Sequence, residues 1–157
     1  LLQYGVEAFL EDAADAGAQG LLLTDVPVGA DPNVEDAVRS SKLDLSPLIA
    51  PTTRPERASV IAESGQGFVY YISRTGVTGA RDGFAVDLEN EVRALRARVD
   101  LPVAVGFGIS TPEQAASVSR IADGVVVGSA LITALDRGGI EEAGTFLASL
   151  RTAMDKE

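Results

Sequence analysis

Five short apolar runs, each followed by a stretch of helical period, constrain the fold of this chain more than any other feature. Their hydrophobicity is continuous rather than alternating, as strands covered on both faces require. A repeated alternation of strand and helix predicts a parallel sheet with right-handed crossovers, either an open doubly wound sheet or a closed barrel. The runs occupy residues 20–26, 45–50, 67–72, 102–107 and 124–127.

Start and stop signals mark the helices that follow these runs. Thr53 and Glu56, after the second run, have the spacing of a capping box, and Thr111 and Gln114 have the same spacing after the fourth run. Gly65 is placed to end the helix that begins near Thr53, in the left-handed conformation. Further helices are predicted over 31–38 and, from apolar positions spaced by three and four, over 88–99, with an opening helix over 9–16 and a closing helix over 140–154.

The length of the chain favours a barrel of which part is present. Five units in 157 residues give about 31 residues per unit, whereas a complete (β/α)8 barrel of eight units needs roughly 250. The sequence begins at Leu1 without a methionine, and it holds no linker or low-complexity stretch. We therefore expect residues 1–157 to form one α/β domain, an incomplete parallel (β/α)8 TIM barrel whose first three units are missing.

Composition narrows the possible functions. A net charge of −10 argues against nucleic acid and anionic membranes as partners, and no apolar run approaches the roughly 20 residues that span a bilayer. The chain has no cysteine and no histidine, so acid or base chemistry falls to carboxylates, lysine or tyrosine, and thiolate metal sites are excluded. The cysteine-free composition fits a cytoplasmic protein.

Two consecutive strand ends carry the clearest chemical signal. Residues 105–110 read Val-Gly-Phe-Gly-Ile-Ser and residues 127–130 read Val-Gly-Ser-Ala, each leading into a helix. Glycines allow close backbone approach, and the free N–H groups of helix starts attract anions. In barrels the loops after the last two strands commonly bind phosphate. Either turn alone would be explained by tight turning, but two in adjacent units favour a phosphate site.

The loop after the third run, residues 73–81, has the composition of a lid over a binding site. It reads Ser-Arg-Thr-Gly-Val-Thr-Gly-Ala-Arg, with two glycines as hinges and two threonines able to hydrogen-bond a ligand. A solvated surface loop would have a similar composition, so this pattern alone leaves both interpretations open.

Four motifs together closely resemble the tryptophan synthase α chain family. They are Asp-Val-Pro at 25–27, Tyr-Tyr-Ile-Ser-Arg-Thr-Gly-Val-Thr-Gly-Ala at 70–80, Gly-Phe-Gly-Ile-Ser at 106–110 and Gly-Ser-Ala at 128–130. Other phosphate-binding barrels share the last two motifs only, and the lid motif separates this family from them. The likeness covers essentially the whole chain and corresponds to barrel units four to eight.

The resemblance implies an activity for the intact subunit. It would cleave indole-3-glycerol phosphate to indole and glyceraldehyde 3-phosphate, a reversed aldol reaction of tryptophan biosynthesis that uses no metal or organic cofactor. Indole would pass to a β subunit in an α2β2 assembly. The family's catalytic Glu and Asp lie in an earlier segment with no counterpart here, so the resemblance implies no catalytic residue in this chain and predicts that it is inactive alone.

The resemblance also implies roles for individual residues. The substrate phosphate would lie against Gly79, Gly108, Ile109, Gly128 and Ser129. The indole pocket would include Phe107, Tyr70 and Leu22, and the closed lid would depend on Arg74 and Thr78. Asp25 and Pro27 would belong to the interface with the β subunit. No residue is assigned to a metal.

Two other functions compete with this interpretation. One is another phosphate-binding barrel enzyme, a sugar-phosphate isomerase or a thiamine-phosphate type of synthase, which would share the glycine turns but not the lid. The other is a non-catalytic partner that stabilises or activates a β subunit through the strand-end face. If indole-propanol phosphate gave no protection to an intact version of the protein, the first alternative would be favoured over a tryptophan synthase α chain. Co-purification with a β subunit tests the second alternative.

Overall fold

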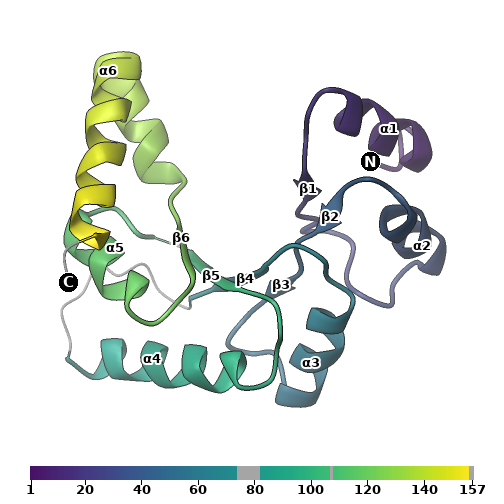
Figure 1. The fold of residues 1–157 in the computed structure, drawn as a ribbon, viewed down its shortest axis with the longest axis horizontal. Helices are drawn as coiled ribbons and strands as arrows, with labels where there is room; N and C mark the ends of the chain where they lie inside the picture. The colour runs from purple at the N-terminus through teal and green to yellow at the C-terminus, as the bar shows by residue number, and fades with distance from the viewer. Residues whose placement is uncertain (74–81, 107, 156–157) are drawn as a thin grey trace.

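The computed structural model describes residues 1–73, 82–106 and 108–155, with the backbone alone for 82–86. Six helices and six strands lie along these ranges and alternate, except that β2 and β3 follow one another directly (Figure 1). The strands are β1 (Gly20–Leu21), β2 (Asp44–Leu45), β3 (Leu48–Ile49), β4 (Val69–Ile72), β5 (Val103–Gly106) and β6 (Gly124–Val126). The helices are α1 (Val6–Asp15), α2 (Pro32–Ser40), α3 (Pro55–Glu63), α4 (Asp82–Arg96), α5 (Pro112–Ser119) and α6 (Ser129–Met154).

The strands pair in parallel and in chain order. β1 pairs with β2, and β3, β4, β5 and β6 follow one another in the second ladder. A doubly wound sheet reverses its strand order part-way, whereas a barrel does not. The described strands show no such reversal, so of the two arrangements that the sequence left open they have the barrel's.

The predicted second strand is divided into β2 and β3 at Ser46–Pro47. Pro47 has no backbone N–H, so the ladder loses a donor there. Backbone bonds still bridge the break, because Ser46 N donates to Leu21 O at 2.8 Å and Tyr70 N donates to Pro47 O at 2.8 Å. The two pieces therefore occupy one strand position. The first predicted strand, 20–26, is shorter than expected and keeps ladder pairing only over Gly20–Leu21.

Alternate residues of the strands face the helices and the barrel interior. In β4, Val69 and Tyr71 are buried against the helices, while Tyr70 and Ile72 are half-buried on the other face. Val103 and Val105 of β5 are fully buried on the helix side. The main core therefore lies between the strands β3–β6 and the helices α3–α6, and a second, smaller core joins α1, α2 and β2.

The helix caps confirm two predictions and correct a third. At α5, Thr111 Oγ1 accepts from Gln114 N at 3.3 Å and Gln114 Oε1 accepts from Thr111 N at 3.2 Å, which completes the capping box. At α2, the Asp31 carboxylate accepts from the first-turn amides as an N-cap. The capping box predicted from Thr53 was wrong, because that hydroxyl accepts from Ala50 N in the preceding turn instead.

The end of α3 also differs from the prediction. The helix stops at Glu63 with Ser64 as a right-handed C-cap, and Gly65 does not have a positive φ. A Cβ at Gly65 would lie 2.6 Å from Pro47 Cγ and 2.9 Å from Leu101 Cδ1. Glycine is needed there for close packing rather than for a left-handed turn.

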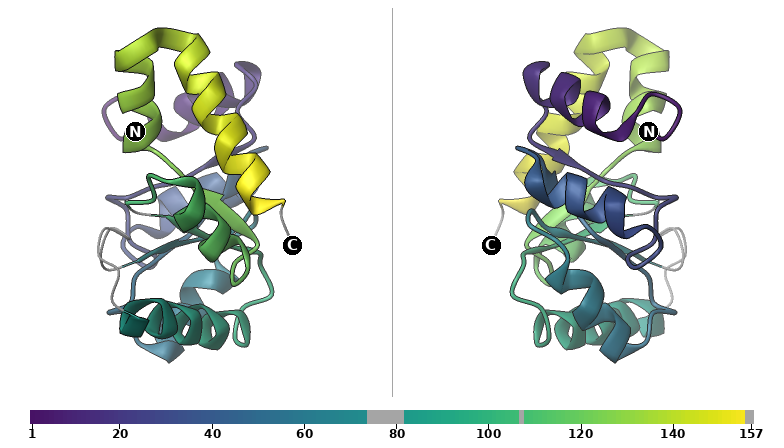
Figure 2. Two further views of the ribbon diagram at one scale, coloured as in Figure 1. Left: turned by 90° about the vertical axis from the view of Figure 1, so that its left-hand side faces the viewer. Right: turned by 90° about the vertical axis from the view of Figure 1, so that its right-hand side faces the viewer.

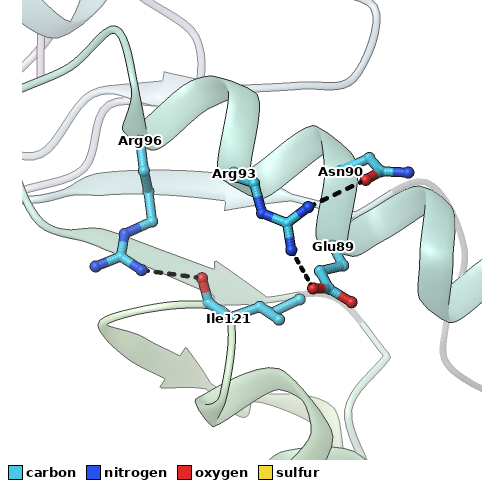
Figure 3. A network of polar contacts seen from close by, with 5 residues as sticks. All are labelled: Glu89, Asn90, Arg93, Arg96 and Ile121. Carbon is cyan, nitrogen blue, oxygen red and sulfur yellow. Dashed lines mark hydrogen bonds and ion pairs between the residues drawn. The ribbon is translucent and has the colours of Figure 1, made fainter.

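Near the C-terminal end of α4, one arginine bonds within the helix and the next bonds to a neighbouring loop (Figure 3). Arg93 pairs with Glu89 one turn earlier and contacts Asn90, and Arg96 Nη1 donates to Ile121 O at 3.4 Å. Arg96 Nη2 also pairs with Asp123 at 2.7 Å. The two Arg96 contacts hold α4 against the loop between α5 and β6.

The molecule is an arc rather than a closed ring. In Figure 1, α1 and α6 stand at opposite ends of the row of strands, with α3 and α4 below it. The two end views in Figure 2 show α1 and much of α6 above the strands and α3 and α4 below them. No helix among the described residues is both long enough and apolar enough to cross a membrane.

Candidate functional site

The loops after β5 and β6 leave the sheet side by side. Gly106 and Val126 are register partners at the ends of these two strands. Gly108 lies two residues after Gly106, and Gly128 lies two residues after Val126. Because neighbouring parallel strands lie about 4.8 Å apart, the two glycine turns start from adjacent points at the same edge of the sheet.

The turn after β5 has the backbone conformation that glycine favours. Gly108 has a φ of 73° and is exposed. The next side chain, Ile109, is only 3% exposed and packs into the main core, which anchors the turn. Ser110 N donates to Gln114 Oε1 at 2.8 Å and is therefore occupied by the capping box. The amides of Gly108 and Ile109 have no acceptor among the described residues.

The turn after β6 is the N-terminus of α6. Gly128 is its N-cap and makes no side-chain cap, and Ser129 is the exposed first residue of the helix. A Cβ at Gly128 would meet nothing within 4 Å. The Gly128 and Ser129 amides also lack an acceptor among the residues that the structure describes. Free N–H groups at a helix start carry partial positive charge, so this turn is chemically suited to an anion.

On the interior face, Tyr70 of β4 lies across Gly106 of β5. A Cβ added to Gly106 would come within 2.8 Å of Tyr70 Cζ and 3.0 Å of Val126 Cβ. Real Cβ atoms do not come as close as 2.8 Å to another atom. With Tyr70 in this position, residue 106 must therefore be a glycine. Sequence reasoning identified Tyr70 but missed Gly106. A glycine within a predicted strand is the signal that could have shown a close approach.

Ser73 is a second residue that sequence reasoning left without a role. Its side chain is 2% exposed, and its N–H donates to Gly106 O at 3.1 Å. The Ser73 hydroxyl lies 3.4 Å from the same carbonyl oxygen. The residue therefore holds the end of β4 to β5 where the segment 74–81 begins.

Several predicted site residues lie outside the described ranges. These are Arg74, Thr78 and Gly79 of the lid segment and Phe107 of the indole pocket. Leu22 lies just beyond β1, with 39% of its surface exposed. Tyr70 belongs to β4, next to the strand that ends at Gly106, whereas Leu22 follows β1 at the other end of the row of strands.

The predicted interface residues lie on the loop after β1. Asp25 and Pro27 are both exposed. Pro27 lines a hollow of about 620 Å³ between this loop and the start of α3, whose other walls are Leu23, Thr24, Val26, Val28, Leu48, Thr52, Thr53, Arg54, Arg57 and Ile61. Arg57 donates to Val28 O and so ties the loop to α3. The hollow is distinct from the glycine turns.

Comparison with known proteins decides the family. The family model described as tryptophan synthase alpha chain matches residues 1–156, nearly the whole length. The chain belongs to the tryptophan synthase α chain family. The tryptophan synthase alpha chain of Geobacter sp. (strain M21) is 44% identical over an alignment 160 residues long, which covers 99% of this chain and 60% of that relative. That of Acidiphilium cryptum is 46% identical over 138 residues, 88% of this chain and 50% of the relative.

Solved structures of tryptophan synthase agree with the fold. The α subunit from Legionella pneumophila superposes with a TM-score of 0.87 at 34% identity, covering 99% of this chain and 59% of that one. An aminoacrylate-bound tryptophan synthase structure from M. tuberculosis gives a TM-score of 0.84 at 35% identity and covers 98% and 57%. The arc is thus part of a TIM barrel, and the chain spans about three fifths of the length of its tryptophan synthase relatives.

Proposed function

We propose that this chain supplies the phosphate-binding and lid half of a tryptophan synthase α subunit. The whole subunit, a carbon–carbon lyase, cleaves indole-3-glycerol phosphate to indole and glyceraldehyde 3-phosphate in tryptophan biosynthesis, a cytoplasmic pathway. Family membership over residues 1–156 supports the activity. The observation that carries the site is the pair of glycine turns, which start from register partners and present amides without acceptors among the described residues.

The phosphate of the substrate binds the amides of Gly108, Ile109, Gly128 and Ser129, joined by Gly79 of the lid. The net charge of −10 does not oppose this, because helix-start amides act within the first turn and the field of distant exposed charges is screened beyond about 10 Å. Ile109 contributes through its buried side chain, which holds the turn in place. No metal is needed to neutralise the phosphate.

The indole ring lies on the interior side of the strands, between Phe107, Tyr70 and Leu22. Tyr70 is half-buried on that face, and its ring is positioned by Gly106. Arg74 and Thr78 close the lid over the bound substrate. Ser73 supports this arrangement because it is bonded to Gly106, the last residue of β5, at the point in the sequence just before the lid segment.

Asp25 and Pro27 contact the β subunit in an α2β2 assembly. Both are exposed on the loop after β1, at the carboxyl end of the strand, where barrel enzymes open their sites. A β subunit docked there would receive indole directly from the pocket. Pro27→Asp should therefore abolish β binding, and in a chain that carries the missing barrel units it should leave indole release unchanged.

The 157 residues alone are expected to release no indole. The family's catalytic Glu and Asp have no counterpart among them, and the strands do not enclose a pocket on all sides. The test is a chimera in which the preceding barrel units of the Geobacter sp. relative are fused to Leu1. The chimera should release indole from indole-3-glycerol phosphate, and the chain alone should not. Release by the chain alone, or none by a folded chimera, contradicts the proposal.

A charge placed in the cradle tests the phosphate site within this chimera. Ser129→Asp puts a carboxylate beside the free amides, and repulsion of the phosphate should raise KM by at least about tenfold. Thr145→Asp, at an exposed position in the second helical piece of α6, is the matched control and should change KM less than about twofold. If the two variants raised KM equally, the phosphate could not be assigned to this helix start. If the chimera binds a β subunit but releases no indole, the non-catalytic partner is the better function.

A further inference from the structure

The loop after β1 contains a tight turn over residues 27–30. Ala30 N donates to Pro27 O at 2.9 Å, and Gly29, at the third position, has a φ of 86°. A φ of this size at the third position is typical of a type II turn. Types I and II differ in the orientation of their central peptide, which here joins Val28 to Gly29. The conformation of the turn therefore depends on which way this one peptide points.

Both polar groups of the central peptide bond to charged side chains. Its carbonyl, Val28 O, accepts from Arg57 Nη2 of α3, and its N–H, on Gly29, donates to Glu35 Oε1 of α2. A hydrogen bond with one ionised partner is roughly twice as strong as a neutral one. If the peptide turned over, its N–H would face the arginine and its carbonyl would face the carboxylate, so both bonds would be lost. Glu35 and Arg57 therefore favour a single conformation of the turn, and we call the two side chains the turn clamp.

The turn clamp is the polar link between this turn and the two helices beside it. In the part of the chain that the structure describes, no backbone hydrogen bond joins residues 27–30 to α3. Neither Glu35 nor Arg57 forms an ion pair with another described residue. Glu35 is half-buried, so its carboxylate is directed by the fold rather than free in solvent. The charges of the clamp thus act on the turn itself.

We infer that Glu35 and Arg57 are positioning residues for partner binding, because they hold the turn that presents Pro27. The inference rests on the proposed contact of Pro27 with a β subunit. Asp25 depends less on the clamp, since Val26 beside it packs against the smaller core. A segment that already has its bound conformation loses less conformational entropy when it binds. The clamp raises the affinity for the partner through the shape of the turn.

Hydrogen exchange in the 157-residue chain tests the clamp without any partner. The Gly29 amide should exchange at least about fivefold faster in Arg57→Met and in Glu35→Met, because the central peptide is then held from one side only. Arg57→Lys keeps a charged donor and should stay within about twofold of the original chain. Protection of the Val103 amide reports whether each variant keeps its core. Unchanged exchange at Gly29 in a folded Arg57→Met chain would overturn the inference.

Calorimetric titration of the chimera with a purified tryptophan synthase β subunit tests the effect on binding. Arg57→Met should raise the Kd at least about fivefold, and Arg57→Lys should restore most of the affinity. Arg54→Met is the matched control, because Arg54 is an exposed arginine that lines the same hollow and makes no hydrogen bond to a described residue. It should change the Kd less than about twofold. Exchange of the two charges, by Glu35→Arg with Arg57→Glu, keeps the net charge but favours the opposite peptide orientation, so it should not restore binding.

Pro27→Asp separates this inference from the interface on which it rests. If Pro27→Asp abolishes binding while Arg57→Met leaves the Kd unchanged, the interface stands and the positioning role is overturned. If Pro27→Asp itself leaves the Kd unchanged, the proposed interface is wrong and the inference fails with it. Equal weakening by Arg54→Met and Arg57→Met would also overturn the inference, because positive charge at the hollow, and not the shape of the turn, would then determine affinity.

Discussion

At the scale of single residues, the site depends on small side chains that make room for larger ones. Gly106 lies under Tyr70, and a methyl group added there would press on Tyr70 and on Val126 at once. The position of the Tyr70 ring is thus set by an absent side chain on the neighbouring strand. The tyrosine could be predicted from the motif, but its dependence on Gly106 follows from strand register and needs coordinates.

Gly106→Ala should destabilise the chain by about 1–3 kcal/mol through overpacking, and should move the Tyr70 ring. Tyr70→Ala combined with Gly106→Ala should recover part of the loss, because the shorter side chain leaves space for the new methyl. A double-mutant cycle by urea unfolding measures the coupling, which should exceed about 0.5 kcal/mol. Strict additivity of the two substitutions would show that the contact is unimportant.

Asp123 is a second residue on which several elements depend. Its carboxylate accepts from Val103 N at 2.9 Å and from Arg96 Nη2 at 2.7 Å. Asp123→Ala should cost about 1–3 kcal/mol, because the amide of the buried Val103 loses its acceptor. Arg96→Met removes the half-exposed ion pair and the long, exposed bond to Ile121 O, and should cost less than about 1 kcal/mol. Urea unfolding of both variants checks the order, and a larger effect of Arg96→Met would reverse this account.

At the scale of elements, helix ends decide how each unit turns back to the sheet. The capping box of α5 was predictable because Thr111 and Gln114 act within one turn, so sequence spacing fixes their contact. The equivalent capping box does not form at α3, because the Thr53 hydroxyl accepts a hydrogen bond from the preceding Ala50 N–H instead. Local competition between two such bonds cannot be decided from spacing alone, which explains why one box was right and the other wrong.

The break inside α6 depends on Gly139. It has a φ of 65° and a ψ of −152°, and it separates two helical pieces. Gly139→Ala should cost about 1–3 kcal/mol, because a Cβ is strained in this conformation. Gly144→Ala is the matched control within the helix, where an added Cβ meets nothing within 4 Å, and it should stabilise by up to about 1 kcal/mol. Thermal unfolding of both variants should give shifts of opposite sign.

The first turn of α5 gives a pH dependence. The pKa of Glu113 is lowered from its ordinary value of 4.5, first by a hydrogen bond from its own backbone N–H and then by one from Thr111. A folded pKa below the unfolded one contributes stability that is present above pH 4.5 and is lost as the pH falls through the folded value. Glu113→Gln should therefore lose less stability than the original chain between pH 7 and pH 3. Urea midpoints at the two pH values measure this, and equal losses would contradict the assignment.

At the scale of the whole molecule, the parallel strands follow one another in chain order, as in a TIM barrel. The fold class could be predicted because five continuous apolar runs alternate with helical periods, and the glycine turns could be placed because they follow strand ends. The shortening of the first strand and the division of the second at Pro47 could not be predicted, since both depend on pairing between distant segments. The contact of Ser73 with Gly106 was hidden for the same reason.

The central claim is that the amides of Gly108, Ile109, Gly128 and Ser129 bind one phosphate group. Titration of the ¹⁵N-labelled chimera with indole-propanol phosphate, followed by amide chemical shifts, tests it most directly. We expect all four amide signals to shift and saturate together with a single Kd, while the capped Ser110 amide shifts less. Independent Kd values, or unchanged signals at both glycines while the ligand binds elsewhere, would contradict the account.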